Sequence, residues 1–178
     1  MQVIADAMRL ELLGANRHHI SKIASLLHEE WGSLPPWASL SDIESRFVTL
    51  ADAETDAFAL VALSAEDELL GTASVKLYEL ENHPDKKHWL GEVFIPRLLR
   101  GQGIGSALIR ECLCQGAKLG VNVLYLYTPD QQALYSRFGW REIESTTING
   151  EDVSIMARTT THNTTVQGTL RDEAAPPP

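Results

Sequence analysis

Residues 92–106 read EVFIPRLLRGQGIGS, and this stretch decides the fold. Its first residues favour a strand and the run from Ile104 favours a helix, with a loop rich in glycine and arginine between them. The first amides of a helix have no partner inside the helix and lie at its positive end, so they favour an anion. Three glycines in five residues let the backbone approach that anion, and Arg97 and Arg100 add positive charge. The stretch therefore predicts a site for phosphate or pyrophosphate.

Two other interpretations of these glycines are open. They could form only a tight turn, although three glycines, an arginine and a helix start seldom coincide in a mere turn. They could also bind a dinucleotide, because Gly101-x-Gly103-x-x-Ser106 nearly matches G-x-G-x-x-G and Asp130 follows about 20–25 residues later. Ser106 in place of the third glycine, the five residues between strand and glycines, and the proline before Asp130 count against the dinucleotide site.

Downstream of the glycines, the pattern predicts a helix from about 104 to 119 that ends at Gly120. A strand over 121–127 consists of β-formers throughout, so we expect both of its faces to be buried. Asp130 is expected to cap a short helix that runs to Phe138. Strands over 140–144 and 152–157 are then expected to pair around the turn Asn149-Gly150.

Upstream, a strand is predicted over 8–13, followed by a helix that Asn16 caps and that continues to Trp31. A second helix is expected to start at Ser41, with Glu44 completing a capping box. Strands are predicted over 57–64, 69–80 and 89–95. The order is thus βααβββαβαββ, which indicates an α/β fold with a mixed sheet of about 6–7 strands and about 4 helices on its two faces.

Length and composition favour one globular domain, because 178 residues leave no room for a second. We expect the domain to cover residues 1–158 and the Thr- and Pro-rich residues 159–178 to form a flexible tail. The net charge of −9 argues against a nucleic-acid partner. The apolar runs are shorter than the ~20 residues that cross a bilayer, so we expect a cytoplasmic protein without a membrane partner.

The cysteines and histidines form no metal-binding pattern along the sequence. Cys112 and Cys114 lie two apart on a predicted helix, so their side chains diverge and cannot readily pair. The six histidines lack the i, i+4 spacing that would bring two of them to one ion. We therefore expect no metal site.

Two motifs resemble a known family. Arg100-x-x-Gly103-x-Gly105 matches the R/Q-x-x-G-x-G/A signature of the GNAT N-acetyltransferases, and it follows a strand as that signature does. Residues 134–140, LYSRFGW, resemble the family's L-Y-x-x-x-G-F element, with one helix and one strand between the two motifs. The resemblance covers nearly all of residues 8–158. It implies the GNAT fold, an acyltransferase that moves an acetyl group onto an amine, acetyl coenzyme A (acetyl-CoA) as co-substrate, and no metal.

The resemblance also implies roles for residues of the coenzyme site. The pyrophosphate is expected on the loop amides of Arg100, Gly101, Gln102, Gly103, Ile104, Gly105 and Ser106. The pantetheine arm is expected to bind along the backbone of Val93, Phe94 and Ile95 like an added strand. Thr128 stands where many relatives have an asparagine that contacts the coenzyme, and its hydroxyl could replace that asparagine only partly.

Two residues are expected to handle protons. Tyr135 matches the family's tyrosine near the sulfur, which is thought to protonate the departing thiolate. Glu92 is expected to take a proton from the acceptor amine, directly or through water, since many relatives place a carboxylate there. A packed aromatic role for Tyr135 and a structural or water-ordering role for Glu92 remain open.

The resemblance implies an acceptor site that the first two helices and their connecting loop cover. Its expected lining residues combine aromatic rings with carboxylates, which suits a cationic amine: Glu29, Glu30, Trp31, Trp37 and Tyr78. Trp31 falls on the apolar face of its helix, so core packing is the better interpretation of that residue. We expect a small primary amine as acceptor, with a protein or peptide N-terminus, or a silent acyl-CoA sensor, as alternatives. The chain faintly resembles the acetyltransferase of processed actin N-termini, but an acidic peptide would prefer a basic groove. A monomer or homodimer is expected.

Overall fold

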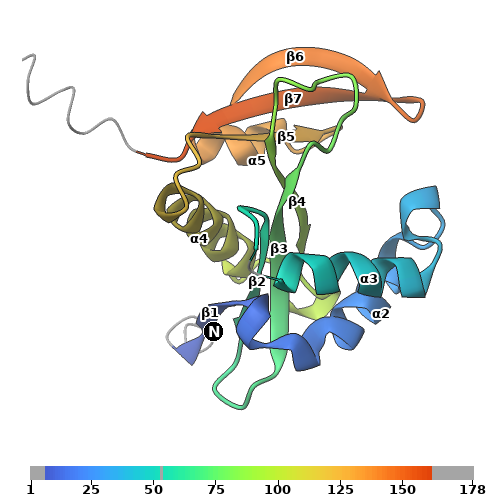
Figure 1. Ribbon diagram of the computed structural model, residues 1–178, viewed down its shortest axis with the longest axis vertical. Coiled ribbons are helices and arrows are strands. Elements are labelled where there is room, and N and C mark those ends of the chain that lie inside the picture. Colours follow the sequence, from blue (N-terminus) through green and yellow to red (C-terminus); the bar gives the residue numbers. More distant parts are fainter. Residues whose placement is uncertain (1–6, 53, 162–178) are drawn as a thin grey trace, which may run out of the picture.

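The computed structural model describes residues 7–52 and 54–161, which form a mixed sheet with helices on both faces (Figure 1). The seven strands lie in the order β1-β2-β3-β4-β5-β7-β6. Their bounds are β1 Arg9–Leu12, β2 Phe58–Leu63, β3 Leu69–Leu77, β4 His88–Phe94, β5 Val123–Thr128, β6 Arg141–Ile148 and β7 Glu151–Thr159. The predicted order βααβββαβαββ and the α/β fold with a mixed sheet are therefore confirmed.

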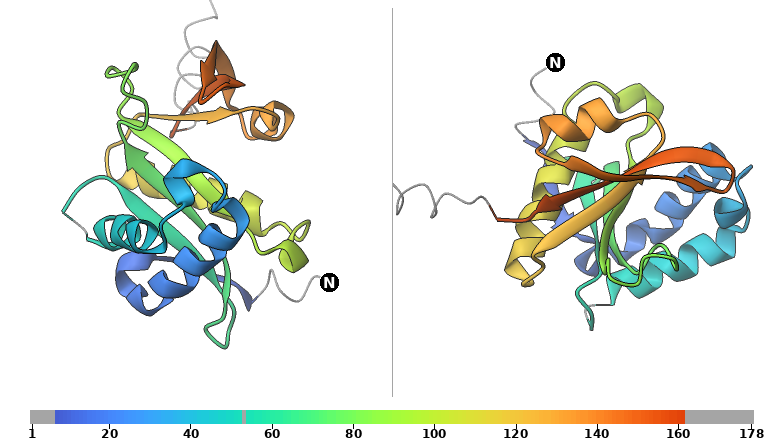
Figure 2. Two further views of the ribbon diagram at one scale, coloured as in Figure 1. Left: turned by 90° about the vertical axis from the view of Figure 1, so that its right-hand side faces the viewer. Right: turned by 90° about the horizontal axis from the view of Figure 1, so that it is seen from above.

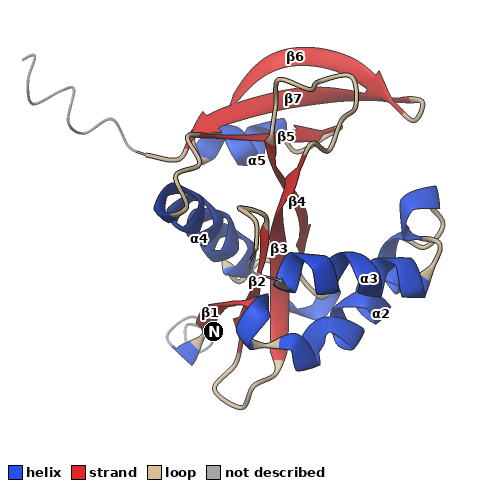
Figure 3. Cartoon of the chain, viewed as in Figure 1, coloured by secondary structure: helices blue, strands red, loops and turns tan. Residues whose placement is uncertain are grey.

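Helices α2 and α3 cover one face of the sheet, and α4 covers the other (Figure 3). The bounds of the helices are α2 Ile20–Trp31, α3 Leu40–Ala51, α4 Ile104–Lys118 and α5 Gln132–Arg137. One core forms between the sheet and α4, and the other lies between the sheet and the pair α2 and α3. Strand β2 is buried along its whole length because Leu60 belongs to the first core and Val61 to the second.

The sheet divides between β4 and β5. These two strands are parallel and share a single registered pair, Trp89 with Tyr125, whereas the other neighbouring strands are antiparallel with longer registers. Beyond that pair, β5 and the β6–β7 hairpin turn away from β2, β3 and β4 (Figure 2). The ends of β4 and β5 are thereby left apart on the side where α4 begins.

Helix α3 begins differently from the sequence-based expectation. Ser39, not Ser41, is the N-cap, and its hydroxyl accepts a hydrogen bond from the backbone N–H of Asp42 at 3.3 Å. Asn16 does not cap α2 with its side chain, because its amide donates to Glu11 and to the carbonyl of Leu12. The starts of these two helices therefore depend on which nearby groups the Ser39 and Asn16 side chains bond, which the sequence pattern did not predict.

Asp130 does not cap α5: the N-cap is Gln131, without a side-chain cap hydrogen bond, and the Gln131 N–H itself donates to the Thr128 hydroxyl at 3.0 Å. The expectation that β5 is buried on both faces is wrong. Leu124 and Leu126 are buried under α4, but Tyr127 on the opposite face is 37% exposed. The layer formed by α2 and α3 covers β2 and does not extend over β5.

The packed part of the chain continues to Thr160, two residues past the expected domain boundary. The Thr160 backbone N–H donates to the carbonyl of Asn122 at 3.0 Å, and its buried hydroxyl donates to Val121. The rest of the predicted tail, residues 162–178, lies outside the described residues.

Candidate active site

A bulge in β4 places Glu92 at the centre of the site. Thr72 pairs with Phe94 and Ser74 pairs with Gly91, so β4 has one more residue than β3 between these pairs. Glu92 accommodates the extra residue with a φ of 51°, an unusual value for a residue other than glycine. After the bulge, Glu92 and Phe94 point to the face of the sheet that α2 and α3 cover. Val93 points to the other face and packs against the core under α4.

The glycine loop forms a pocket of about 240 Å³ beside the start of α4. Most of the expected coenzyme-binding residues line it, together with three apolar side chains: Val93, Ile95, Leu99, Arg100, Gly101, Gly103, Ile104, Gly105, Ser106, Ile109 and Leu134. Gly101 and Gly103 have φ values of 77° and 85°, and a Cβ added at either would meet nothing within 4 Å. Open space above backbone amides at a helix start fits the pyrophosphate of coenzyme A.

The Arg100 side chain connects the glycine loop to the end of β4 and to α2. Its Nε donates to the carbonyl of Ile95 at 2.8 Å, and its Nη2 lies 2.9 Å from an oxygen of Glu30. Glu30, which is expected to line the acceptor site, thus forms an ion pair with Arg100 of the glycine loop. Glu29 and Glu30 line a separate pocket of about 390 Å³ that also borders Phe94 and Arg97.

The Glu92 carboxylate is buried beside a lysine. Its side chain is 3% exposed, and its Oε1 lies 2.8 Å from Nζ of Lys76, which also contacts Glu79 at 2.8 Å. Burial opposes the charge of Lys76, but the two carboxylates outweigh it and raise the pKa of Lys76 above its ordinary value. The second oxygen, Oε2, is buried and has no hydrogen-bond partner among the described residues. Glu92 thus has one oxygen at Lys76 and one buried without a protein partner among the described residues.

An acidic pocket of about 480 Å³ borders this group of charges. Three segments line it, namely the loop before α3, the β3–β4 loop and the β6–β7 turn, with Tyr127 at its wall: Pro36, Glu79, Leu80, Glu81, Asn82, His83, Tyr127, Thr146, Thr147, Ile148 and Asn149. The pKa of Tyr127 is raised, first by burial and then by the charge of Glu79, so its hydroxyl lies within the influence of the Lys76 group. Glu79 thus joins the pocket to Lys76 and, through it, to Glu92.

This pocket was not predicted from the sequence, and the aromatic residues expected around the acceptor lie elsewhere. Trp31 and Trp37 pack against each other with ring centroids 5.0 Å apart, and the Arg46 guanidinium lies 4.4 Å from the centroid of the Trp37 ring. Tyr78 is 55% exposed and does not line the pocket, although its neighbour Glu79 does. Glu79-Leu80-Glu81, two carboxylates just past the end of a strand, is the sequence signal that could have pointed to the pocket.

Tyr135 and Thr128, both expected to contact the coenzyme, are not among the residues that line the glycine-loop pocket. Tyr135 packs on Trp140 with ring centroids 5.8 Å apart, and burial is the main cause that raises the pKa of its phenol above the usual 10.0. The phenol therefore stays protonated at neutral pH, as a proton donor must. Leu134, its neighbour on α5, lines the pocket. The Thr128 hydroxyl already accepts the Gln131 N–H, which leaves it one proton to donate.

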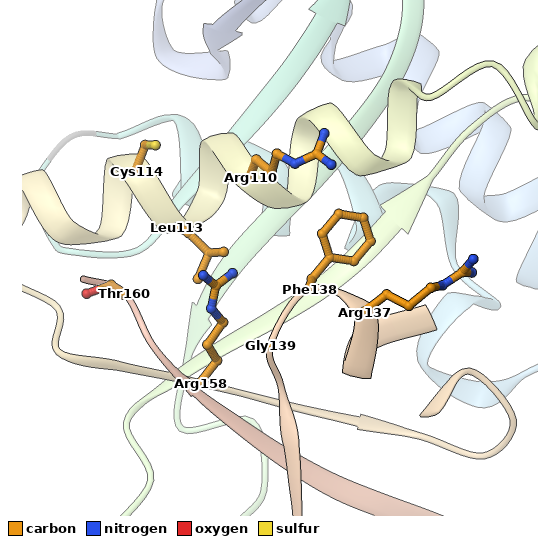
Figure 4. A pocket seen from close by; sticks show the side chains of 8 residues that line it. All are labelled: Arg110, Leu113, Cys114, Arg137, Phe138, Gly139, Arg158 and Thr160. Atoms are coloured by element: carbon orange, nitrogen blue, oxygen red, sulfur yellow. The ribbon is translucent and has the colours of Figure 1, made fainter. Parts of the chain in front are cut away.

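Three arginines gather in another pocket, of about 480 Å³, between α4, the end of α5 and β7 (Figure 4). Its lining residues, all in the described part of the chain, include no acidic side chain: Arg110, Leu113, Cys114, Arg137, Phe138, Gly139, Arg158 and Thr160. Arg110 lies 5.2 Å from the centroid of the Phe138 ring. In a protein of net charge −9, these arginines favour the approach of an anionic ligand along α4 and α5.

Comparison with known proteins agrees with this arrangement. The model of the acetyltransferase (GNAT) family matches residues 20–140, which include the β4 bulge, the glycine loop and Tyr135. The chain belongs to the GNAT family. It is therefore an acyltransferase of a family that uses acetyl-CoA as co-substrate, as the two sequence motifs predicted. The comparison with curated proteins gives no match.

Solved structures share the GNAT fold at low sequence identity. A chimera of the spermidine N-acetyltransferase SpeG from Vibrio cholerae and hSSAT has a TM-score of 0.66 and 20% identity, over 86% of this chain and 96% of that one. A putative acetyltransferase from Acinetobacter baylyi has a TM-score of 0.68 and 16% identity, over 85% and 91%. A GNAT acetyltransferase from Staphylococcus aureus gives 0.63 and 17%, over 87% and 100%. None of the described helices has the length and apolar character needed to span a membrane.

Proposed function

We propose that this GNAT acetyltransferase transfers the acetyl group of acetyl-CoA to a primary amine of a small cationic molecule. The observation that carries the proposal is the unpartnered, buried Oε2 of Glu92, together with the acidic pocket to which Lys76 and Glu79 connect it. A positively charged amine is attracted by the carboxylates of Glu79 and Glu81. Three chain segments bound the pocket, which favours a small acceptor over an extended peptide.

Glu92 is the proposed proton acceptor. An ammonium group cannot attack a carbonyl carbon until it loses a proton, and a buried carboxylate oxygen without another partner is suited to take that proton, directly or through water. Lys76 fixes the orientation of the carboxylate by holding its other oxygen. Acetyl-CoA supplies the acetyl group as a thioester, which the neutral amine attacks directly.

The glycine loop and Thr128 are proposed to hold the coenzyme. Backbone amides from Arg100 to Ser106 bind the pyrophosphate, and Val93, Phe94 and Ile95 offer backbone groups to the pantetheine arm where β4 leaves β5. The bulge supports this arrangement, because the extra residue leaves backbone groups that β3 does not pair.

Tyr135 is the proposed donor to the departing thiolate, and its replacement by phenylalanine tests that role. We expect kcat to fall about tenfold with little change in KM for acetyl-CoA, a modest effect because a thiol is already a good leaving group. The raised pKa of Tyr135 keeps the donor protonated, so the deficit should stay constant across roughly pH 7–9. Steady-state release of coenzyme A thiol measures it. Tyr125→Phe is the control, and equal losses in both variants would remove the donor role.

The proposed activity is tested by thiol release from acetyl-CoA with a panel of amines. Spermidine belongs in the panel because structural neighbours are spermidine N-acetyltransferases, alongside shorter diamines, amino sugars, amino acids and short peptides. Release with cationic small amines that exceeds release with peptides supports the proposal. Acetylation of peptides alone would contradict the small acceptor, and tight coenzyme binding without release for any amine would indicate a silent acyl-CoA sensor.

A further inference from the structure

Two histidines and an aspartate meet at a place that the coenzyme and acceptor pockets do not include. His18 and His19 lie in the short 3-10 helix Arg17–His19 that precedes α2, and Asp67 lies at the tip of the β2–β3 hairpin, with a φ of 66°. Nε2 of His18 is 2.6 Å, and Nε2 of His19 is 3.4 Å, from Oδ2 of Asp67. The three potential ligand atoms all lie within 4.8 Å of one another.

His19 gives an independent reason to place a ligand here. The residue is 8% exposed, and its Nε2 is buried without a hydrogen-bond partner, since its contact with Asp67 does not meet hydrogen-bond geometry. A buried imidazole nitrogen without a partner is costly, and such groups are usually satisfied by protein, water or an ion. The nitrogen faces the carboxylate of Asp67, so an ion between the two would satisfy both.

We propose that His18, His19 and Asp67 bind one divalent transition-metal ion, with zinc as the natural probe. Two imidazole nitrogens and one carboxylate oxygen are the ligand types that zinc prefers, whereas Mg²⁺ and Ca²⁺ prefer oxygen alone. Bonds of ~2.0–2.1 Å in tetrahedral geometry separate ligand atoms by roughly 3.3–3.4 Å. The His19–Asp67 distance already fits that spacing, and the exposed His18 side chain is free to move out from its 2.6 Å contact with Asp67.

The surroundings leave the metal-facing oxygen accessible. Arg9 is the neighbouring cation, but its Nη2 approaches Oδ1 of Asp67, at 3.4 Å, and so leaves Oδ2 to the histidines. Three protein ligands leave a coordination position for water. A bound ion would fasten the segment before α2 to the β2–β3 hairpin, so the expected consequence is stabilisation of the fold.

Zinc titration of the full chain tests the proposal. The exposed Cys114 can itself bind zinc, so the parent protein is Cys114→Ser. Calorimetry should show one zinc ion per chain, and zinc at a hundred times its Kd should raise Tm by roughly 5–10 °C. Magnesium should leave Tm unchanged. His18→Ala removes an exposed ligand, and Asp67→Asn removes the carboxylate charge with a residue type that tolerates the left-handed backbone.

Both variants should lose at least tenfold in zinc affinity, and most of the zinc-dependent rise in Tm. His88→Ala is the matched control, because His88 lies 2.6 Å from Asp56 in the same kind of pair but without a second histidine. It should keep the parent's zinc response. Absence of a one-to-one zinc complex, or equal affinity in parent, His18→Ala and Asp67→Asn, would overturn the proposal and leave an ion pair between His18 and Asp67.

Discussion

Replacing Glu92 by glutamine is expected to lower kcat by about 10²–10⁴-fold, the contribution that a positioned general base makes. Glutamine has nearly the same shape, but its amide cannot accept the proton that the acceptor ammonium must lose. Because the coenzyme loop is untouched, KM for acetyl-CoA should stay close to the wild-type value. The measurement is steady-state thiol release with the best amine of the panel, at saturating acetyl-CoA.

A contrasting variant separates proton transfer from charge attraction. Glu81 lines the acidic pocket, and no ion pair joins it to Lys76. Glu81→Gln should raise KM for the amine a few-fold and leave kcat nearly unchanged, because the Glu81 carboxylate is expected to attract the amine without taking its proton. Since Glu92→Gln also removes one charge beside Lys76, its melting temperature must be recorded. If the Glu92→Gln enzyme is folded and keeps the wild-type kcat, Glu92 is not the general base and serves only as a structural partner of Lys76.

Alanine at Gly103 is expected to raise KM for acetyl-CoA by about 10–100-fold. Gly103 is the N-cap of α4 with a φ of 85°, and a Cβ there would meet nothing within 4 Å in the pocket that we propose for the coenzyme. A methyl group there would keep the pyrophosphate from the backbone amides. Hydrogen bonds to a charged group are worth about 1.5–3 kcal/mol each, and every 1.4 kcal/mol changes an affinity about tenfold.

Gly120→Ala provides the matched control for backbone strain. Gly120 has a φ of 78° and equally open surroundings, but it follows the C-terminal end of α4, away from the glycine loop. A left-handed backbone costs a residue with a Cβ about 1–2 kcal/mol, so both variants should lose roughly 2–8 °C in Tm. KM should change only in Gly103→Ala. An equal change in both variants would mean that strain, and not the coenzyme contact, accounts for the effect.

The parts of the site that the sequence predicted are those encoded by contiguous residues. The glycine loop and the start of α4 follow from glycine conformation and from the unpaired amides of a helix N-terminus, which are local properties. Glu92 was predicted from the family resemblance, which places a carboxylate just before the strand section that is expected to bind the pantetheine arm. Its role as a base, and the donor role of Tyr135, remain predictions that the variants above test.

The parts that escaped prediction depend on residues far apart in the chain. Lys76 meets Glu92 across two strands, beside a bulge that shifts the pairing of β3 with β4, and no local sequence pattern predicts that bulge. The acidic pocket needs the β3–β4 loop and the β6–β7 turn to meet. His18 and His19 were judged by their spacing to other histidines, whereas the group that joins them is Asp67, which a hairpin brings from another part of the chain.

Because β4 and β5 share a single registered pair, we expect local unfolding to separate the sheet between these two strands. Residues 123–159 form a β-rich unit whose one registered strand pair with the rest is Trp89 with Tyr125, and which also contacts it through the core under α4 and through the pair His83–Glu144. Amide hydrogen exchange should therefore be faster along this seam than in the centre of β2 or β3. A coenzyme lying between the two strands would bridge the two parts, so its binding would slow exchange on both sides of the seam and make the domain unfold as one cooperative unit.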